Sequence, residues 1–328
     1  MTVLPWWQRA SGLGLLLLGI AFAQDPIRVN VRLVRVLATV KDASGALVGS
    51  LDKSDFTIRD NGVPQEVAVF ERRTEQPLSV ALMIDNSGST AIDIKYEITS
   101  VSRFLQAMFR EGNLDDTVGL YSFNYEVVRQ HDFARNVAAL ERPLRTLKSE
   151  AGTALYDAIY LVAGELQHRQ GRRVMVIVTD GGDTVSSKDF HAALEAAQLA
   201  DASIYPILVV PIENNAGRNS GGENALTGLA QGTGGRVFLP TLGAQMDAAF
   251  DQIIRELRTQ YYLAYYPKDI PLTKDRFHRL QVQARQPGLQ VLTRSGYYGD
   301  WRPDGGAEDR IAVDPRTATP PVKSTRNH

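Results

Sequence analysis

Asp85, Ser87 and Ser89 are spaced by two residues in the segment that follows the apolar run 80–84. Alternate side chains of an extended segment point to the same side, so these three side chains can converge on one point. Carboxylate and hydroxyl oxygens are hard ligands that suit Mg²⁺, Mn²⁺ or Ca²⁺ better than zinc. A helix cap by Ser89 would account for one of these residues, but not for all three.

Two further segments carry side chains of the same kind. Asp180 follows the apolar run 174–178 and precedes two glycines, and Thr153 lies at the start of a predicted helix. Ligands of open parallel sheets bind at the carboxyl ends of the strands, so Asp85 and Asp180 share one edge if their strands are neighbours. The Thr153 hydroxyl can bind a cation or cap its helix, and by itself the local sequence favours the cap.

Residues 78–260 alternate between strand-like and helix-like patterns. Continuous apolar runs at 80–84, 174–178 and 204–210 predict strands buried on both faces, as in a parallel sheet covered by helices. Segments 118–123 and 127–133 predict a strand pair whose second member is an antiparallel edge. Helices are expected over residues 91–109, 136–147, 154–168, 187–200 and 243–259. Together these elements predict an α/β fold with a doubly wound, mostly parallel sheet.

The flanks of this region predict short strands instead. Asp60-Asn61-Gly62 predicts a hairpin between strands 56–59 and 67–70, and residues 29–37 are also rich in β-prone types. Behind the α/β region, strands are expected at 261–266, 278–284 and 289–298. A two-stranded sheet is marginal in water, so we expect both flanks to form one small β domain.

The three polar segments together resemble a known site. Asp85-x-Ser87-x-Ser89, Gly152-Thr153 and Thr179-Asp180-Gly181 resemble the metal-ion-dependent adhesion site of the von Willebrand factor A family, over roughly residues 78–260. The resemblance implies hydroxyl ligands from Ser87, Ser89 and Thr153, and Asp85 and Asp180 contacting the metal directly or through water.

The flanking motifs resemble a narrower group. Gly49-x-Leu51, Asp60-x-Gly62-x-x-Gln65 and Arg294-x-Gly296-Tyr297 are similar to acidobacterial-type VWFA-related exported proteins. That group is defined by its architecture more than by a reaction.

The composition excludes several classes of function. The absence of cysteine excludes disulfides, thiolate zinc sites and cysteine nucleophiles, and a net charge of -1 gives no overall attraction to nucleic acid or anionic membranes. The five histidines form no pair at metal-binding spacing. Neither a Gly-x-Ser-x-Gly elbow nor a phosphate loop is present, and Gly232–Gly235 predicts a turn into a strand at 236–239.

The amino terminus predicts export. Arg9 precedes the apolar run 13–22, and Ala21-Phe22-Ala23 has the small-x-small form of a signal peptidase site. The run is shorter than the roughly 20 residues of a membrane span, so a cleaved signal peptide is favoured over an uncleaved anchor. We expect a periplasmic or secreted protein with no stable membrane span after cleavage.

The predicted organisation has five parts. They are a signal peptide (1–23), an amino-terminal β segment (24–75), an α/β domain (76–260), a carboxyl-terminal β segment (261–300) and a disordered tail (301–328).

The predicted function is a non-enzymatic, metal-dependent binding or adhesion module. Its cation, Mg²⁺ or else Mn²⁺ or Ca²⁺, would complete its coordination with an acidic side chain of a protein partner. One alternative is a metal-assisted hydrolase in which Asp180 or Asp183 activates water. Another is a structural envelope protein whose metal site is incidental.

Overall fold

The computed structural model describes residues 33–72, 75–88, 94–110, 112–209, 220–240, 244–271 and 276–299. The predicted signal peptide, the predicted tail and Ser89 lie outside these residues. Among the described residues, no helix is long and apolar enough to cross a membrane.

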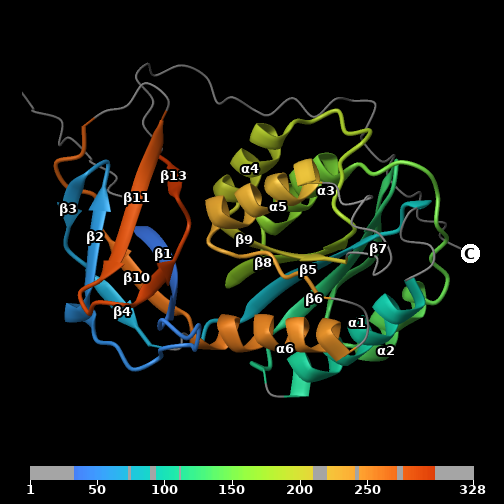
Figure 1. Ribbon diagram of the computed structural model, residues 1–328, viewed down its shortest axis with the longest axis horizontal. Coiled ribbons are helices and arrows are strands. Elements are labelled where there is room, and N and C mark those ends of the chain that lie inside the picture. Colours follow the sequence, from blue (N-terminus) through green and yellow to red (C-terminus); the bar gives the residue numbers. More distant parts are fainter. Residues whose placement is uncertain are drawn as a thin grey trace, which may run out of the picture. The chain divides into compact units, whose positions relative to one another are not determined.

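A five-stranded sheet lies at the centre of the α/β region (Figure 1). Its order is β7-β6-β5-β8-β9, in which β7 is an antiparallel edge strand and the other neighbours are parallel. The strands are β5 (Leu78–Asp85), β6 (Thr117–Phe123), β7 (Val127–Ala134), β8 (Arg172–Thr179) and β9 (Ala202–Leu208). Every residue of β5 is buried, which explains why its apolar run is continuous rather than alternating.

Helices cover both faces of this sheet (Figure 1). Val80, Leu82 and Ile84 of β5 pack into a core with one set of helices, α1 (Ile94–Arg110), α2 (Val137–Leu144) and α6 (Ala244–Thr259). The intervening Ala81 and Met83 pack with the other set, α3 (Leu155–Leu166), α4 (Phe190–Leu199) and α5 (Ser220–Thr233). This alternation follows from the two-residue period of a strand. The predicted doubly wound α/β class is confirmed.

Helix α5 was not expected from the sequence, because it contains several glycines. A Cβ atom at Gly228 would lie 3.0 Å from the ring of Phe190, and one at Gly232 would lie 2.6 Å from Leu194. Both contacts are made with α4. The glycines therefore let α5 pack closely on α4, and this packing outweighs their poor helix propensity.

The flanks form two antiparallel four-stranded sheets, of orders β12-β1-β10-β4 and β13-β11-β2-β3. The first comprises β1 (Val34–Lys41), β4 (Val69–Glu71), β10 (Tyr261–Tyr265) and β12 (Gln290–Leu292). The second comprises β2 (Phe56–Asp60), which follows the short helix η1 (Lys53–Asp55), with β3 (Val63–Gln65), β11 (Phe277–Ala284) and β13 (Gly296–Tyr298). Each sheet combines strands from both flanks, and residues of both sheets share one hydrophobic cluster. The expected small β domain is confirmed, whereas its exact boundaries stay a prediction.

Two segments pair differently from the sequence-based expectation. The hairpin partner of β2 is β3, and not residues 67–70, because β4 pairs with β10 in the other sheet. The strand expected at 236–239 is limited to a single bridge between Phe238 and Ile207.

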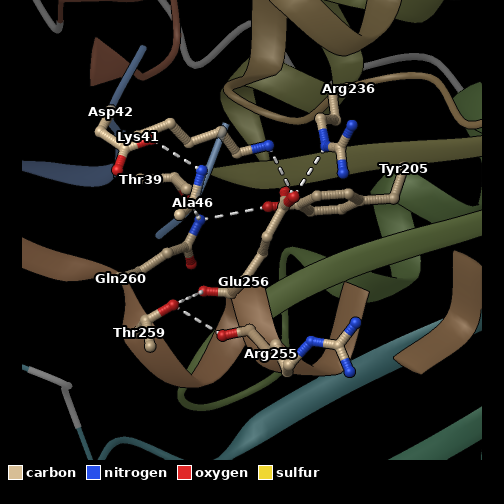
Figure 2. Close-up of polar contacts among 10 residues, drawn as sticks. All are labelled: Thr39, Lys41, Asp42, Ala46, Tyr205, Arg236, Arg255, Glu256, Thr259 and Gln260. Atoms are coloured by element: carbon tan, nitrogen blue, oxygen red, sulfur yellow. Dashed lines mark hydrogen bonds and ion pairs between the residues drawn. The ribbon is translucent and has the colours of Figure 1, made fainter. Parts of the chain in front are cut away.

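Glu256, in the last turn of α6, joins β1 to the α/β region (Figure 2). Its carboxylate accepts hydrogen bonds from Lys41 Nζ at 2.8 Å and from Arg236 Nε at 2.7 Å. Nearby, Gln260 Nε2 donates to Thr39 Oγ1 at 3.2 Å. Buried polar contacts therefore connect the first β sheet to the end of α6.

Candidate functional site

The two predicted aspartate-bearing strands are neighbours. β5 and β8 pair in parallel, with Ile84 opposite Val178, so both strands end at the same edge of the sheet. Thr179 at the end of β8 donates a hydrogen bond from Oγ1 to Asp85 Oδ2 at 2.6 Å. Asp180 follows directly in the chain, which places it at the edge where Asp85 lies.

Asp85 is a buried carboxylate in a polar setting. Its Oδ1 accepts the backbone N–H of Ser87 at 2.9 Å, and the Ser87 hydroxyl also hydrogen-bonds to this carboxylate. Burial and, to a smaller extent, the negative charge of Asp180 raise the pKa of Asp85 to about 6, in spite of the hydrogen bonds from Thr179 and Ser87. Asp85, Ser87 and Asp180 are therefore close enough to interact, and a cation between the carboxylates would relieve their repulsion.

The loop that carries Thr153 lies against the loop that follows β5. Ser87 forms a parallel bridge with Glu150, whose N–H donates to the carbonyl oxygen of Asn86 at 3.1 Å. Thr153 itself is 5% exposed. The N-cap of α3 is Ala154, and no side chain caps the helix from that position. The interpretation of Thr153 as the cap residue is therefore wrong.

A third loop, which follows β8, is joined to the Thr153 loop. The backbone of Thr153 accepts from Thr184 N at 2.9 Å and donates to Thr184 Oγ1 at 2.9 Å. Asp183 Oδ1 accepts from the backbone N of Tyr156 at 3.2 Å and from the Ser186 hydroxyl. Asp183 thus satisfies an amide at the start of α3. The three polar segments predicted from sequence lie side by side at one edge of the sheet.

Helix α5 also contacts the loop that carries Asp180, which the sequence reasoning missed. A Cβ atom on Gly222 would lie only 1.3 Å from the carbonyl oxygen of Gly181, so another residue at position 222 would collide with backbone. Gly181 has a φ of 108°, a conformation that favours glycine. The glycines at 221–222 are the sequence feature behind this contact, but such a pair also fits an ordinary loop.

The donor set fits a hard divalent cation. The described candidate ligands Asp85, Ser87, Thr153 and Asp180 offer only oxygen atoms, from two carboxylates and two hydroxyls. Throughout the described ranges, no three His, Cys, Asp or Glu side chains form a metal-binding group, so a cation here would depend on the hydroxyls. The assignment of these residues as metal ligands stays a prediction.

Residues 80–182 match the family model of the von Willebrand factor type A domain. The chain therefore contains a domain of this family, and the matched residues include Asp85, Ser87, Thr153 and Asp180. No curated protein gives a significant match to this sequence.

Several solved structures have a similar arrangement. The vWF domain of a type V pili tip protein from Porphyromonas gingivalis has 17% sequence identity and a TM-score of 0.47, over 56% of this chain and 95% of that one. An aerotolerance-related membrane protein from Bacteroides fragilis has 19% identity and a TM-score of 0.44, over 55% of this chain and 98% of that one.

Proposed function

We propose that this chain is a non-enzymatic, metal-dependent protein-binding module of an exported bacterial protein. The observation that carries the proposal is the interaction of Asp85 with Ser87 and Asp180, beside the Thr153 loop, in a von Willebrand factor type A domain. Ser87, Ser89 and Thr153 would hold the cation through their hydroxyls, and Asp85 and Asp180 directly or through water.

Bound Mg²⁺ would have an open coordination position, which an acidic side chain of a partner can fill. Neutral hydroxyl ligands leave more of the cation's charge uncompensated than carboxylates do. The burial of Asp85 and Thr153 limits the competition of water with their oxygen atoms for the cation. The partner's carboxylate would therefore replace a water molecule and be held by charge.

The contacts of Asp183 give this residue a structural role. Asp183 Oδ1 already accepts two hydrogen bonds, from Tyr156 and Ser186, which tie two loops together. We therefore assign Asp183 to holding the loops in position.

Calorimetric titration of the purified protein with Mg²⁺ and Mn²⁺ tests the proposal. We expect binding by the wild type and its loss in Asp85→Ala and Asp180→Ala, with unchanged circular dichroism. Thr153→Ala should weaken binding less, because one hydroxyl among several ligands is lost. Asp251→Ala, which removes an exposed carboxylate of α6, is the matched control. Absence of binding by the wild type up to millimolar metal would contradict the site.

Partner capture and export need separate measurements. An affinity pull-down from envelope extract, with Mg²⁺ and with chelator, should retain partners only with Mg²⁺, and Asp85→Ala should behave like the chelated wild type. Equal capture under both conditions would favour a structural role with an incidental site. The intact mass of exported protein should correspond to a chain that begins at Gln24, and a full-length species in the membrane fraction would contradict cleavage.

A further inference from the structure

Two exposed apolar side chains lie next to Gly152, beside the candidate metal site. Tyr125, in the turn between β6 and β7, is 54% exposed, and Val185, in the loop after β8, is 50% exposed. A Cβ atom on Gly152 would lie 3.2 Å from Tyr125 Cβ and 3.4 Å from Val185 Cγ1. Both side chains thus border Gly152, the residue before the candidate ligand Thr153.

Backbone hydrogen bonds hold the segments that carry Tyr125 and Val185 next to Thr153. Val185 N donates to the carbonyl oxygen of Thr153 at 3.3 Å, and Ala154 N donates to the carbonyl oxygen of Asn124 at 2.6 Å. Gly152 has a φ of 87°, so glycine suits this position for its backbone as well as for its small size. The patch of Tyr125 and Val185 is therefore positioned by the same loop as the predicted metal ligand.

Acidic residues border this apolar patch. Glu126 and Glu150 are exposed, and their charges, that of Glu126 more strongly, raise the pKa of the Tyr125 phenol. Glu150 also hydrogen-bonds to this phenol. A partner that reaches the patch would meet negative charge beside it, and a lysine or arginine would complement that charge.

We propose that Tyr125 and Val185, with Glu126 and Glu150 beside them, determine which protein partner the site accepts. The partner would offer an acidic side chain to the metal, a neighbouring aliphatic side chain to Tyr125 and Val185, and a lysine or arginine to the glutamates. This inference rests on the proposed function, because the acidic side chain needs the cation. Aromatic side chains such as Tyr125 supply much of the binding energy where they are buried at an interface.

A displayed library of nine-residue peptides with a central aspartate tests the inference. Selection on the wild-type protein in Mg²⁺ should enrich peptides with an aliphatic residue and a lysine or arginine near the aspartate. Tyr125→Ser and Val185→Ser should each weaken the best peptide about tenfold, the effect of leaving one large apolar side chain unburied. The matched control is Leu199→Ser, because Leu199 is 44% exposed at the end of α4, before β9 begins and so at the opposite edge of the sheet.

Each component of the inference has its own readout. Replacing the peptide's basic residue by glycine should weaken binding to the wild type, but not to the Glu126→Gln/Glu150→Gln double variant. Mg²⁺ affinity without peptide should be unchanged in every patch variant. If Mg²⁺ binds but no peptide is enriched, or if Tyr125→Ser and Val185→Ser behave like Leu199→Ser, the patch proposal is overturned and the metal site stands. If the wild type binds no Mg²⁺, the proposed function fails and this inference fails with it.

Discussion

Replacing Glu256 by glutamine tests how much the buried ion pairs at the end of α6 contribute to stability. The Glu256 side chain is 1% exposed and contacts Lys41 at 2.8 Å and Arg236 at 2.7 Å. Glutamine keeps the size of the side chain and removes its charge. The two cations would then face each other without the carboxylate that now lies between them.

The expected loss follows from the burial of the partners. Removing one member of a buried ion pair costs about 3–5 kcal/mol, since the other charge stays desolvated. Lys41 is 10% exposed, but Arg236 is 28% exposed, so water solvates part of the guanidinium. We therefore expect a loss near the lower end of that range, about 3 kcal/mol of unfolding free energy.

Urea unfolding followed by far- and near-ultraviolet circular dichroism measures this loss. The two probes must give the same transition for a two-state free energy of unfolding to be valid. The double variant Glu256→Gln/Lys41→Met should recover part of the stability, because it removes one uncompensated charge. Arg129→Gln is the matched control. It breaks a pair with side chains 51% and 42% exposed, which should contribute less than about 1 kcal/mol. A similarly small loss for Glu256→Gln would refute the reasoning.

Three further predictions concern the candidate site and the β sheets. The added methyl group of Gly222→Ala would push against the backbone of Gly181 and should weaken Mg²⁺ binding in calorimetry about tenfold. Gly164 has open space around it, so the control variant Gly164→Ala should leave Mg²⁺ binding unchanged. Asp85→Asn removes a buried charge and should abolish metal binding. In chemical unfolding without metal, the variant should be as stable as the wild type or more stable by up to about 3 kcal/mol. A metal-free variant that is less stable than the wild type would contradict this. Deleting residues 261–298 removes two strands that pair with β1, so amide exchange in β1 should accelerate; unchanged exchange would show that β1 does not depend on them.

The α/β class could be predicted because its pattern is local. An apolar run such as β5 is buried on both faces, and a helix such as α6 repeats its apolar residues at helical spacing, so each element is visible within a few residues. The spacing of Asp85 and Ser87 is local in the same way. Helix α5 escaped prediction because its glycines are explained only by segments outside the helix: α4 packs against Gly228 and Gly232, and the loop after β8 packs against Gly222.

The pairing of strands that are far apart in the chain could not be predicted from such local patterns. The sequence indicated that β4 would complete a hairpin, but β4 pairs with β10, which is remote in the chain. Hydrogen bonding to either sheet satisfies the backbone equally well, so the choice depends on which side chains fill the shared core. The sequence likewise contained Lys41 and Glu256 as ordinary charged residues, and only the fold brings them into contact.

The sequence by itself determined the types of oxygen-bearing side chain at the candidate site and their positions after apolar strands. Only the tertiary structure decided that β5 and β8 are neighbours, that Thr179 donates to Asp85, and that Tyr125 and Val185 both border Gly152. The physical reason is that propensity and periodicity act over a few residues. A binding site depends on packing between segments that are far apart in the chain, and that packing is settled by the whole core.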